Sequence, residues 1–144
     1  MKHSHYTIMF FSMILSGLFS TMNVWVDKVD DIRFSLNDVY MTFLMTGWMF
    51  AFMGLFTKDL ASIAFGTILV CVNIWCIRTQ FMVSNTQYIL GMIPHHSMAI
   101  HMSKQLIQNQ PPELTELAAN IIKAQEKEIK IMKRILYKIG YETE

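Results

Sequence analysis

The sequence predicts an all-α protein in which three transmembrane helices precede an antiparallel helical hairpin. Hydrophobic residues make up 53% of the 144 residues and charged residues only 16%, whereas about a quarter of a typical soluble domain is charged. The charges are also uneven: between residues 39 and 77 only Lys58 and Asp59 are charged, while residues 104 to 144 are rich in Lys and Glu. We therefore divide the chain into a transmembrane region, residues 1–83, and a C-terminal hairpin, residues 84–144.

The transmembrane region contains three apolar segments, at about residues 6–26, 39–56 and 60–77. Each approaches the roughly 20 residues that a helix needs to cross a bilayer. The first segment has an alternative interpretation as a signal peptide, because Lys2 precedes a short apolar run. No small-x-small cleavage motif follows it, so a retained helix is favoured. Thr57-Lys58-Asp59 predicts a tight turn between the second and third spans.

Charge leaves the orientation of the spans open. Basic residues near the span ends are almost equally divided between the two sides, with Lys2 and Lys58 on one and Lys28, Arg33 and Arg78 on the other. The positive-inside rule therefore does not discriminate. A net charge of +1 without a basic block argues against nucleic acid as a partner. Cys71 and Cys76, inside the third span, form neither a disulfide framework nor a CxxC motif.

Methionine recurs every four residues in the second span, at Met41, Met45, Met49 and Met53. Thioethers at this spacing are typical of a path for Cu(I), as proposed for the MxxxM motif of the three-span eukaryotic copper transporters. Methionine is also an adaptable packing residue, and the same span is rich in Phe and Trp. Packing against lipid or other helices is the favoured interpretation.

The C-terminal region predicts two helices. Ser84 is a candidate N-cap for a helix that runs to about Gln108. Asn109-Gln110 breaks the pattern, and Pro112 with Glu113 begins a second helix that ends before Gly140. Apolar residues follow at i, i+3 and i+4 spacing through this second helix. Its charged face, which carries Lys123, Glu126, Lys127, Lys130, Lys133 and Arg134, is expected to be a solvated surface.

The most informative segment is Met92-Ile93-Pro94-His95-His96-Ser97-Met98-Ala99-Ile100-His101-Met102, which holds three His and three Met. Soft sulfur ligands select Cu(I), and imidazole binds copper in both oxidation states. Zinc is less natural because no thiolate or HExxH pattern is present, and the paired Glu-x-x-His motifs of a di-iron site are missing. The segment therefore favours a copper site. Pro94 also removes one helical hydrogen bond, and a kink there would open the backbone beside His95.

Two polar residues of the second helix, Gln125 and Glu128, fall on its apolar stripe at about 100° per residue. Folding the hairpin about Gln110 brings residues 124 to 128 opposite His95 and His96. A carboxylate that faces a core is costly unless it is paired or bound to a metal. The alternative to a metal site is a hydrogen-bonded polar lock formed by His96, Gln125 and Glu128 inside a small core.

Residues 84–139 resemble the domain-of-unknown-function family numbered 305. The resemblance rests on the MIPHH motif at residues 92–96, the PEL and LA motifs at residues 112–114 and 117–118, and the IIxAQxxEIxxM string at residues 121–132. It implies a helical, ferritin-like hairpin and an association with copper binding or resistance. It also implies a bacterial inner-membrane protein with a cytoplasmic N-terminus and a periplasmic hairpin. The motif maps onto Met92, His95, His96, Met102, Gln125, Glu128 and Met132, whereas Met98 and His101 are additional to it.

The leading hypothesis is a membrane-anchored copper-binding protein that sequesters Cu(I) or Cu(II) or passes it to a copper-handling partner. His95 and His96 would be the primary ligands, with Glu128 and Gln125 orienting them. The alternatives are a copper transporter that uses the Met41 to Met53 series, and a structural or assembly subunit without metal. No nucleophile and base arrangement or cofactor motif indicates an enzyme. Because a hairpin of about 60 residues makes a marginal core, we expect the protein to form a homo-oligomer.

Overall fold

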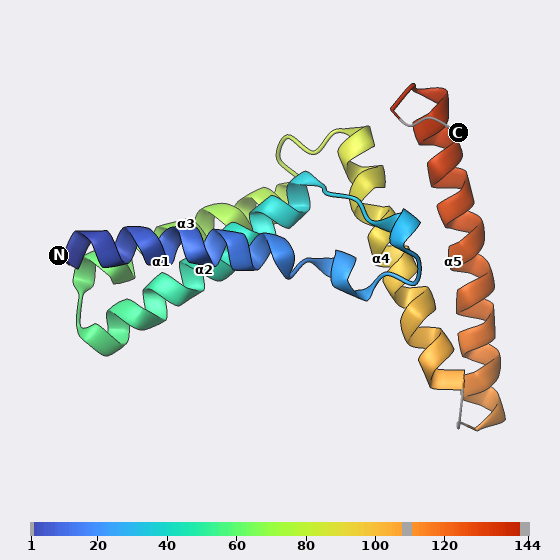
Figure 1. Cartoon of the computed structure of the whole chain (residues 1–144), viewed down its shortest axis with the longest axis horizontal. Coiled ribbons are helices and arrows are strands. Elements are labelled where there is room, and N and C mark those ends of the chain that lie inside the picture. The colour runs from blue at the N-terminus through green and yellow to red at the C-terminus, as the bar shows by residue number, and fades with distance from the viewer. Residues whose placement is uncertain (1, 108–110, 142–144) are drawn as a thin grey trace. The chain divides into compact units, whose positions relative to one another are not determined.

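The structure is a computed structural model that describes residues 2–107 and 111–141. Over these residues the chain contains five α-helices and two short 3-10 helices, and no strand. The all-α prediction is confirmed. The chain divides into two compact units, and Figure 1 labels their helices. Unit 1 is Met1–Thr21 with Leu36–Val83, and unit 2 is Met22–Ser35 with Ser84–Glu144.

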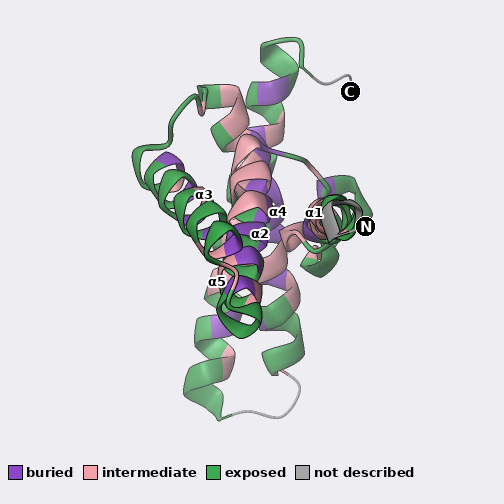
Figure 2. Ribbon diagram, turned by 90° about the vertical axis from the view of Figure 1, so that its left-hand side faces the viewer, coloured by how far each residue is buried: buried purple, intermediate pink, exposed green. Residues whose placement is uncertain are grey.

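Unit 1 contains α1 (Lys2–Phe19), α2 (Leu36–Thr57) and α3 (Leu60–Thr79). Three segments are long and apolar enough to cross a membrane: His5–Trp25, Leu36–Thr57 and Leu60–Thr79. The last two of these coincide with α2 and α3. Figure 2 shows many exposed residues along α3, and the exposed side chains of α1 and α3 include many large apolar ones. This surface suits lipid better than water.

Small residues allow α2 and α3 to pack closely. A Cβ atom added to Gly66 would lie 2.4 Å from the backbone nitrogen of Ala51 and 2.6 Å from the carbonyl oxygen of Gly47. Gly54 is similarly close to the backbone of Ile63. Such close approach is characteristic of helix association in membranes, where no hydrophobic effect drives the helices together. The turn predicted between these helices is present, and Asp59 caps α3 by accepting a hydrogen bond from the Ala61 backbone N–H.

The first predicted span agrees with the apolar segment His5–Trp25, but that segment is not one continuous α-helix. The helix was expected to continue to Val26, but α1 ends at Phe19, and Met22–Trp25 forms the separate 3-10 helix η1. The side-chain amide of Asn23 donates to the Arg33 carbonyl at 2.8 Å and accepts from the Arg33 N–H at 3.0 Å. This pairing joins the two ends of the segment 22–35. The segment, which the sequence placed with the transmembrane region, groups with the C-terminal hairpin.

Unit 2 is built on α4 (Asn85–Leu106) and α5 (Pro112–Lys138), with η1 and η2 (Val29–Asp31) packed against α4. Ser84 caps α4 as predicted, since its side chain accepts from the Gln87 N–H. Glu113 lies in the first turn of α5, and Gly140 follows its end with φ of 71°. The turn predicted at Asn109-Gln110 lies outside the described residues.

The core of unit 2 is small. Among the described residues, its buried apolar cluster comes from the two long helices of the hairpin: Leu90, Ile93, Ile100, Ile129, Met132 and Leu136. Pro94 is also fully buried, and α4 runs through it without interruption. Because α4 keeps the same helical register before and after Pro94, that register determines which α4 side chains face α5.

Candidate metal site in the C-terminal hairpin

The two helices of the hairpin bring His96 and Glu128 together, as the predicted register requires. Nδ1 of His96 lies 3.1 Å from Oε2 of Glu128. The His96 side chain is only 12% exposed, whereas that of Glu128 is 52% exposed. The carboxylate is therefore hydrated, and the imidazole is enclosed by the hairpin.

The polar groups at this level are not satisfied by hydrogen bonds. Nδ1 of His96 is buried and makes none, although Oε2 of Glu128 lies 3.1 Å away. Oε1 of Gln125 is also buried without a hydrogen-bond partner. A buried polar atom without a partner is costly, and each one in a folded protein calls for an explanation. A polar lock of His96, Gln125 and Glu128 would be expected to satisfy these atoms.

The environment of His96 favours the neutral imidazole. Burial lowers the pKa of His96 below its ordinary value, the Glu128 carboxylate partly opposes that shift, and His95 adds to it. A neutral imidazole presents a free lone pair on one ring nitrogen. This is the form in which histidine binds metals.

One thioether group of each helix lies one turn from this level, both toward the same end of the hairpin. Met92 lies one turn before His96 on α4 and packs against the core, and Met132 lies one turn after Glu128 on α5 and is buried. Residues four apart share one face of a helix. The enclosed part of the predicted ligand set therefore consists of His96, Gln125, Met92 and Met132, with Glu128 at its edge.

The remaining predicted ligands are more dispersed. His95 is exposed, and its ring centre lies 5.9 Å from that of His96. Met102 is 55% exposed and Met98 is half-buried. His101 lies four residues after Ser97 and so shares the face of α4 that carries Ser97. Among the described residues, no three His, Cys, Asp or Glu side chains converge as a metal-binding group, so any metal site here depends on thioether or amide donors as well.

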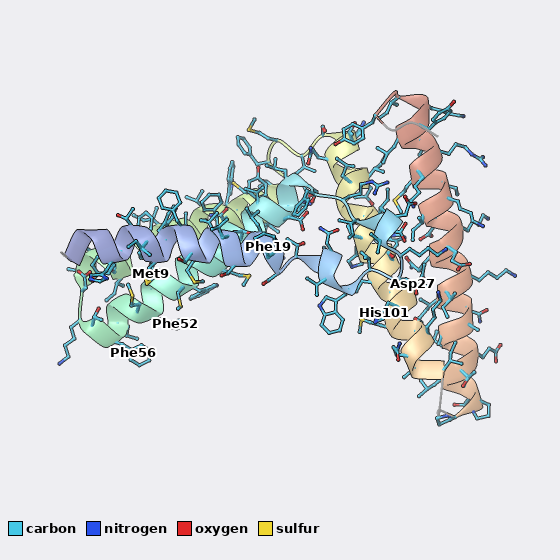
Figure 3. All side chains as sticks on the ribbon, in the orientation of Figure 1. Met9, Phe19, Asp27, Phe52, Phe56 and His101 are labelled. Atoms are coloured by element: carbon cyan, nitrogen blue, oxygen red, sulfur yellow. The ribbon has the colours of Figure 1, made fainter. Side chains whose placement is uncertain are left out.

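The side of the hairpin opposite the His96–Glu128 contact carries a network of ion pairs and hydrogen bonds that the sequence did not reveal. The Ser97 hydroxyl donates to Asp31 at 2.7 Å and accepts from the Asp27 N–H at 2.9 Å. The Lys133 ammonium lies 2.7 Å from Asp31 and also pairs with Asp30. Figure 3 shows Asp27 beside α4, where its carboxylate pairs with Lys104 at 2.6 Å. The acidic segment 27–31 thereby joins both helices of the hairpin.

The expectation that Lys133 is a solvated surface residue was wrong. Its side chain is 26% exposed, and its partner Asp31 is buried, at 3% exposed. Burial on its own lowers the pKa of Lys133, but hydrogen bonds to Asp30 and Asp31 outweigh it and raise the pKa. The signal available in the sequence was three aspartates within the five residues 27–31, a density of acidic groups that calls for nearby cations.

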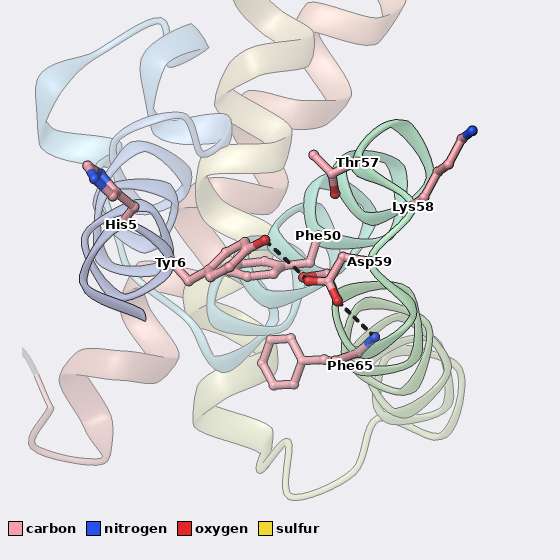
Figure 4. Close-up of a pocket in the computed structure, with 9 residues that line it drawn as sticks. His5, Tyr6, Phe50, Thr57, Lys58, Asp59 and Phe65 are labelled. Carbon is pink, nitrogen blue, oxygen red and sulfur yellow. Dashed lines mark hydrogen bonds between the residues drawn. The ribbon is translucent and has the colours of Figure 1, made fainter. Parts of the chain in front are cut away.

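Unit 1 contains a cavity of about 850 Å³, shown in Figure 4. Its polar end is the Asp59 carboxylate, which accepts from Tyr6 at 3.2 Å and from Ser62 at 2.6 Å. Phe50 and Phe65 line its apolar part. Hydrogen bonds, the one from Ser62 first, hold the pKa of Asp59 below its ordinary value. Because these bonds already occupy the carboxylate, its evident role is to anchor α1 to the start of α3.

The methionine series of α2 lies mostly on the outside of unit 1. Met41, Met45 and Met49 are 48%, 45% and 44% exposed, and Met53 is half-buried. The buried residues of α2 are other ones: Asp38, Thr42, Thr46, Gly47, Phe50 and Gly54. The series therefore does not line an internal path within one chain.

Comparison with known proteins identifies the C-terminal half. Residues 79–142 match the model of the family described as "Domain of unknown function (DUF305)". "Uncharacterized protein L153" of Acanthamoeba polyphaga mimivirus is 39% identical over 142 residues, which cover 94% of this chain and 93% of that protein. No solved structure matches. The chain therefore belongs to the same family as this mimivirus protein and carries a DUF305 domain at residues 79–142.

Proposed function

We propose that this protein is a membrane-anchored copper-binding protein that sequesters copper or hands it to a partner. The observation that carries the proposal is the enclosed His96 imidazole, whose Nδ1 and whose neighbour Gln125 Oε1 lack hydrogen bonds. A bound cation would satisfy the Gln125 oxygen, while Nδ1 of His96 faces Glu128 at 3.1 Å and leaves Nε2 as the metal-binding nitrogen. The donor set fits copper, since one imidazole lies within a turn of two thioethers, and this combination favours Cu(I).

Each residue has a definable role in this proposal. His96 supplies the first ligand, and Met92 and Met132 supply soft donors one turn away. Glu128, 3.1 Å from the imidazole, orients the ring and balances the charge of the cation. His95 is exposed, and so it is placed to receive copper from a partner or release copper to it. The role is binding and transfer, without catalysis.

The three apolar helices give the proposal its location. In a chain with three spans, the end of α1, the start of α2 and the end of α3 emerge on the same side of the membrane. The contacts of Asp31 with Ser97 and Lys133 support this arrangement, because they require segment 22–35 and the hairpin to share one side. We propose that this is the extracytoplasmic side, with the N-terminus opposite. The bacterial inner membrane is expected from the family resemblance alone, and the similar protein is from a mimivirus.

Copper titration of the full-length protein in detergent, in competition with a chelator of known affinity, tests the proposal. We expect His96→Ala to abolish high-affinity Cu(I) binding. The matched control is His5→Ala, because His5 is an exposed histidine of α1 far along the chain from the site. Wild-type binding by His96→Ala at unchanged helicity would refute the proposal.

A double variant of α2 distinguishes the copper-transporter alternative from the copper-binding proposal. Met41→Leu combined with Met45→Leu preserves the apolar surface of α2 and removes two thioethers. We expect this double variant to bind copper normally. Loss of copper uptake in proteoliposomes by this variant, with binding by the hairpin intact, would favour transport through an assembly of several chains.

A further inference from the structure

One side of the hairpin is covered by segment 22–35, and the other side is an exposed apolar face. On α4, residues that recur at heptad spacing lie on the side of the helix opposite Ser97: Tyr88, His95, Ala99, Met102 and Leu106, with the half-buried Met92 at the edge. On α5, a second series at the same spacing points away from Lys133: Leu114, Leu117, Ile121, Ala124, Glu128, Ile131 and Ile135. We call these two series together the open face. The contact between His96 and Glu128 shows that both series border the same side of the hairpin.

The open face is apolar and largely uncovered. Tyr88 and Met102 are 53% and 55% exposed, and Leu117, Ile131 and Ile135 are 55%, 46% and 40% exposed. Heptad spacing on both helices is the pattern by which helices pack knobs into holes with other helices. A two-helix core of this size is also marginal by itself. The face is therefore suited to a further pair of helices.

The polar residues of the open face indicate which partner fits. His95 and Glu128 on the open face lie at the level of the enclosed His96, between apolar residues toward both ends. A bilayer surface would have to accept the Glu128 carboxylate in its apolar layer, which is costly. A second copy of the hairpin, related to the first by a two-fold axis at this level, would place the same residues opposite each other, because a two-fold interface is self-complementary. Acidic and imidazole groups of one copy would then meet those of the other.

We infer that the open face docks on the open face of a second copy, and that the two copies complete one metal site between them. The four helices would form a bundle in which both His96–Glu128 pairs lie near the two-fold axis. This supplies the further donors that one chain lacks, since no three His, Cys, Asp or Glu side chains converge in the described part of a single hairpin. The shared-site part rests on the proposed copper function; the dimer does not.

The dimer is tested by the molar mass of the full-length protein in detergent, measured by light scattering with the detergent contribution subtracted. Leu117→Asp and Ile135→Asp place a charge on the open face at least roughly 10 Å along α5 from Glu128, at 1.5 Å per residue. Tyr137→Asp is the matched control, because Tyr137 is 48% exposed on α5 but outside the open face.

We expect a wild-type dimer, at least a tenfold weaker dimer for Leu117→Asp and Ile135→Asp, and no change for Tyr137→Asp. Circular dichroism checks that helicity is retained, and Leu117→Gln serves as the milder variant if the charged ones unfold. A monomeric wild-type chain, or a dimer that the open-face variants leave intact, would overturn the inference.

Copper binding by the same variants tests the shared site. Cu(I) competition titrations should show at least tenfold weaker binding by Leu117→Asp and Ile135→Asp, although every proposed ligand is retained. His96→Ala should lose copper and stay dimeric. Monomeric variants that bind Cu(I) as the wild type does would overturn the shared site and leave the proposed function standing. A dimer that binds no Cu(I) would instead refute the proposed function.

Discussion

Removal of the Asp31 carboxylate should release segment 22–35 from the hairpin. Asp31 is 3% exposed, accepts a hydrogen bond from Ser97 at 2.7 Å and pairs with Lys133 at 2.7 Å. Truncation of one member of a buried ion pair typically costs about 3 to 5 kcal/mol. Lys133 keeps Asp30 as a partner and is 26% exposed, so we expect Asp31→Ala to cost about 3 kcal/mol, the lower end of that range.

Hydrogen exchange measures this cost directly. A loss of about 3 kcal/mol raises the opening equilibrium roughly 100-fold, and amides whose exchange is limited by opening should exchange faster by the same factor. The reporters are the backbone amides of segment 22–35, including the Asp31 N–H bonded to the Lys28 carbonyl. The experiment uses the full-length protein in detergent with mass-spectrometric detection.

The neighbouring acid provides the control. The side chain of Asp30 is 82% exposed, and exposed ion pairs contribute only about 0 to 1 kcal/mol. Asp30→Ala should therefore accelerate exchange only a few-fold, while Asp31→Asn, which keeps an acceptor for the Ser97 hydroxyl, should lie between the two. Equal effects of Asp30→Ala and Asp31→Ala, or no effect of Asp31→Ala, would show that the buried pair does not hold the segment.

Three further predictions concern other parts of the chain. Gly66→Leu should separate α2 from α3, because a Cβ atom there would lie 2.4 Å from the backbone of Ala51; overpacking of this kind costs about 1 to 3 kcal/mol or more. Thermal unfolding in detergent should show a lower midpoint for it than for Thr67→Leu, a change at the exposed neighbouring position, and equal midpoints would contradict close packing. Glu128→Gln should fold normally and bind Cu(I) roughly 10 to 100-fold more weakly, as is typical for a residue that orients a ligand; wild-type affinity in a chelator competition would place Glu128 outside the site. The ion pair between Lys133 and Asp30 should make attachment of segment 22–35 depend on pH. The Lys133 hydrogen bond lowers the pKa of Asp30 from 3.8, so this contribution is complete above that value and is lost as the pH falls through the folded-state pKa. The pKa of Lys133 is raised from 10.5, so its contribution is complete below 10.5 and is lost as the pH rises through the folded-state value. Protection of segment 22–35, corrected for the intrinsic pH dependence of amide exchange, that does not change between neutral and strongly acidic pH would contradict the acid half of this prediction.

The local features of the sequence were enough to predict most helices of this protein. The apolar segments at residues 39–56 and 60–77 gave α2 and α3 to within three residues, because the length of an apolar run is a local property. Ser84 and Gly140 marked ends of the hairpin helices, since caps depend on adjacent residues. The helical period also placed Glu128 opposite His96, a contact that the structure contains.

Only the tertiary structure revealed how segment 22–35 is used. The sequence assigned Lys133 to a solvated surface and extended the first helix to Val26, whereas Lys133 pairs with Asp31 and α1 ends at Phe19. The Lys133 bond to Asp30 spans 103 residues, and the Ser97 bond to Asp31 spans 66. No periodicity encodes such pairs, because they depend on which surfaces meet after the helices form. The unsatisfied atoms of His96 and Gln125 are likewise visible only in three dimensions, because hydrogen-bond satisfaction depends on the distance and angle between groups on different helices.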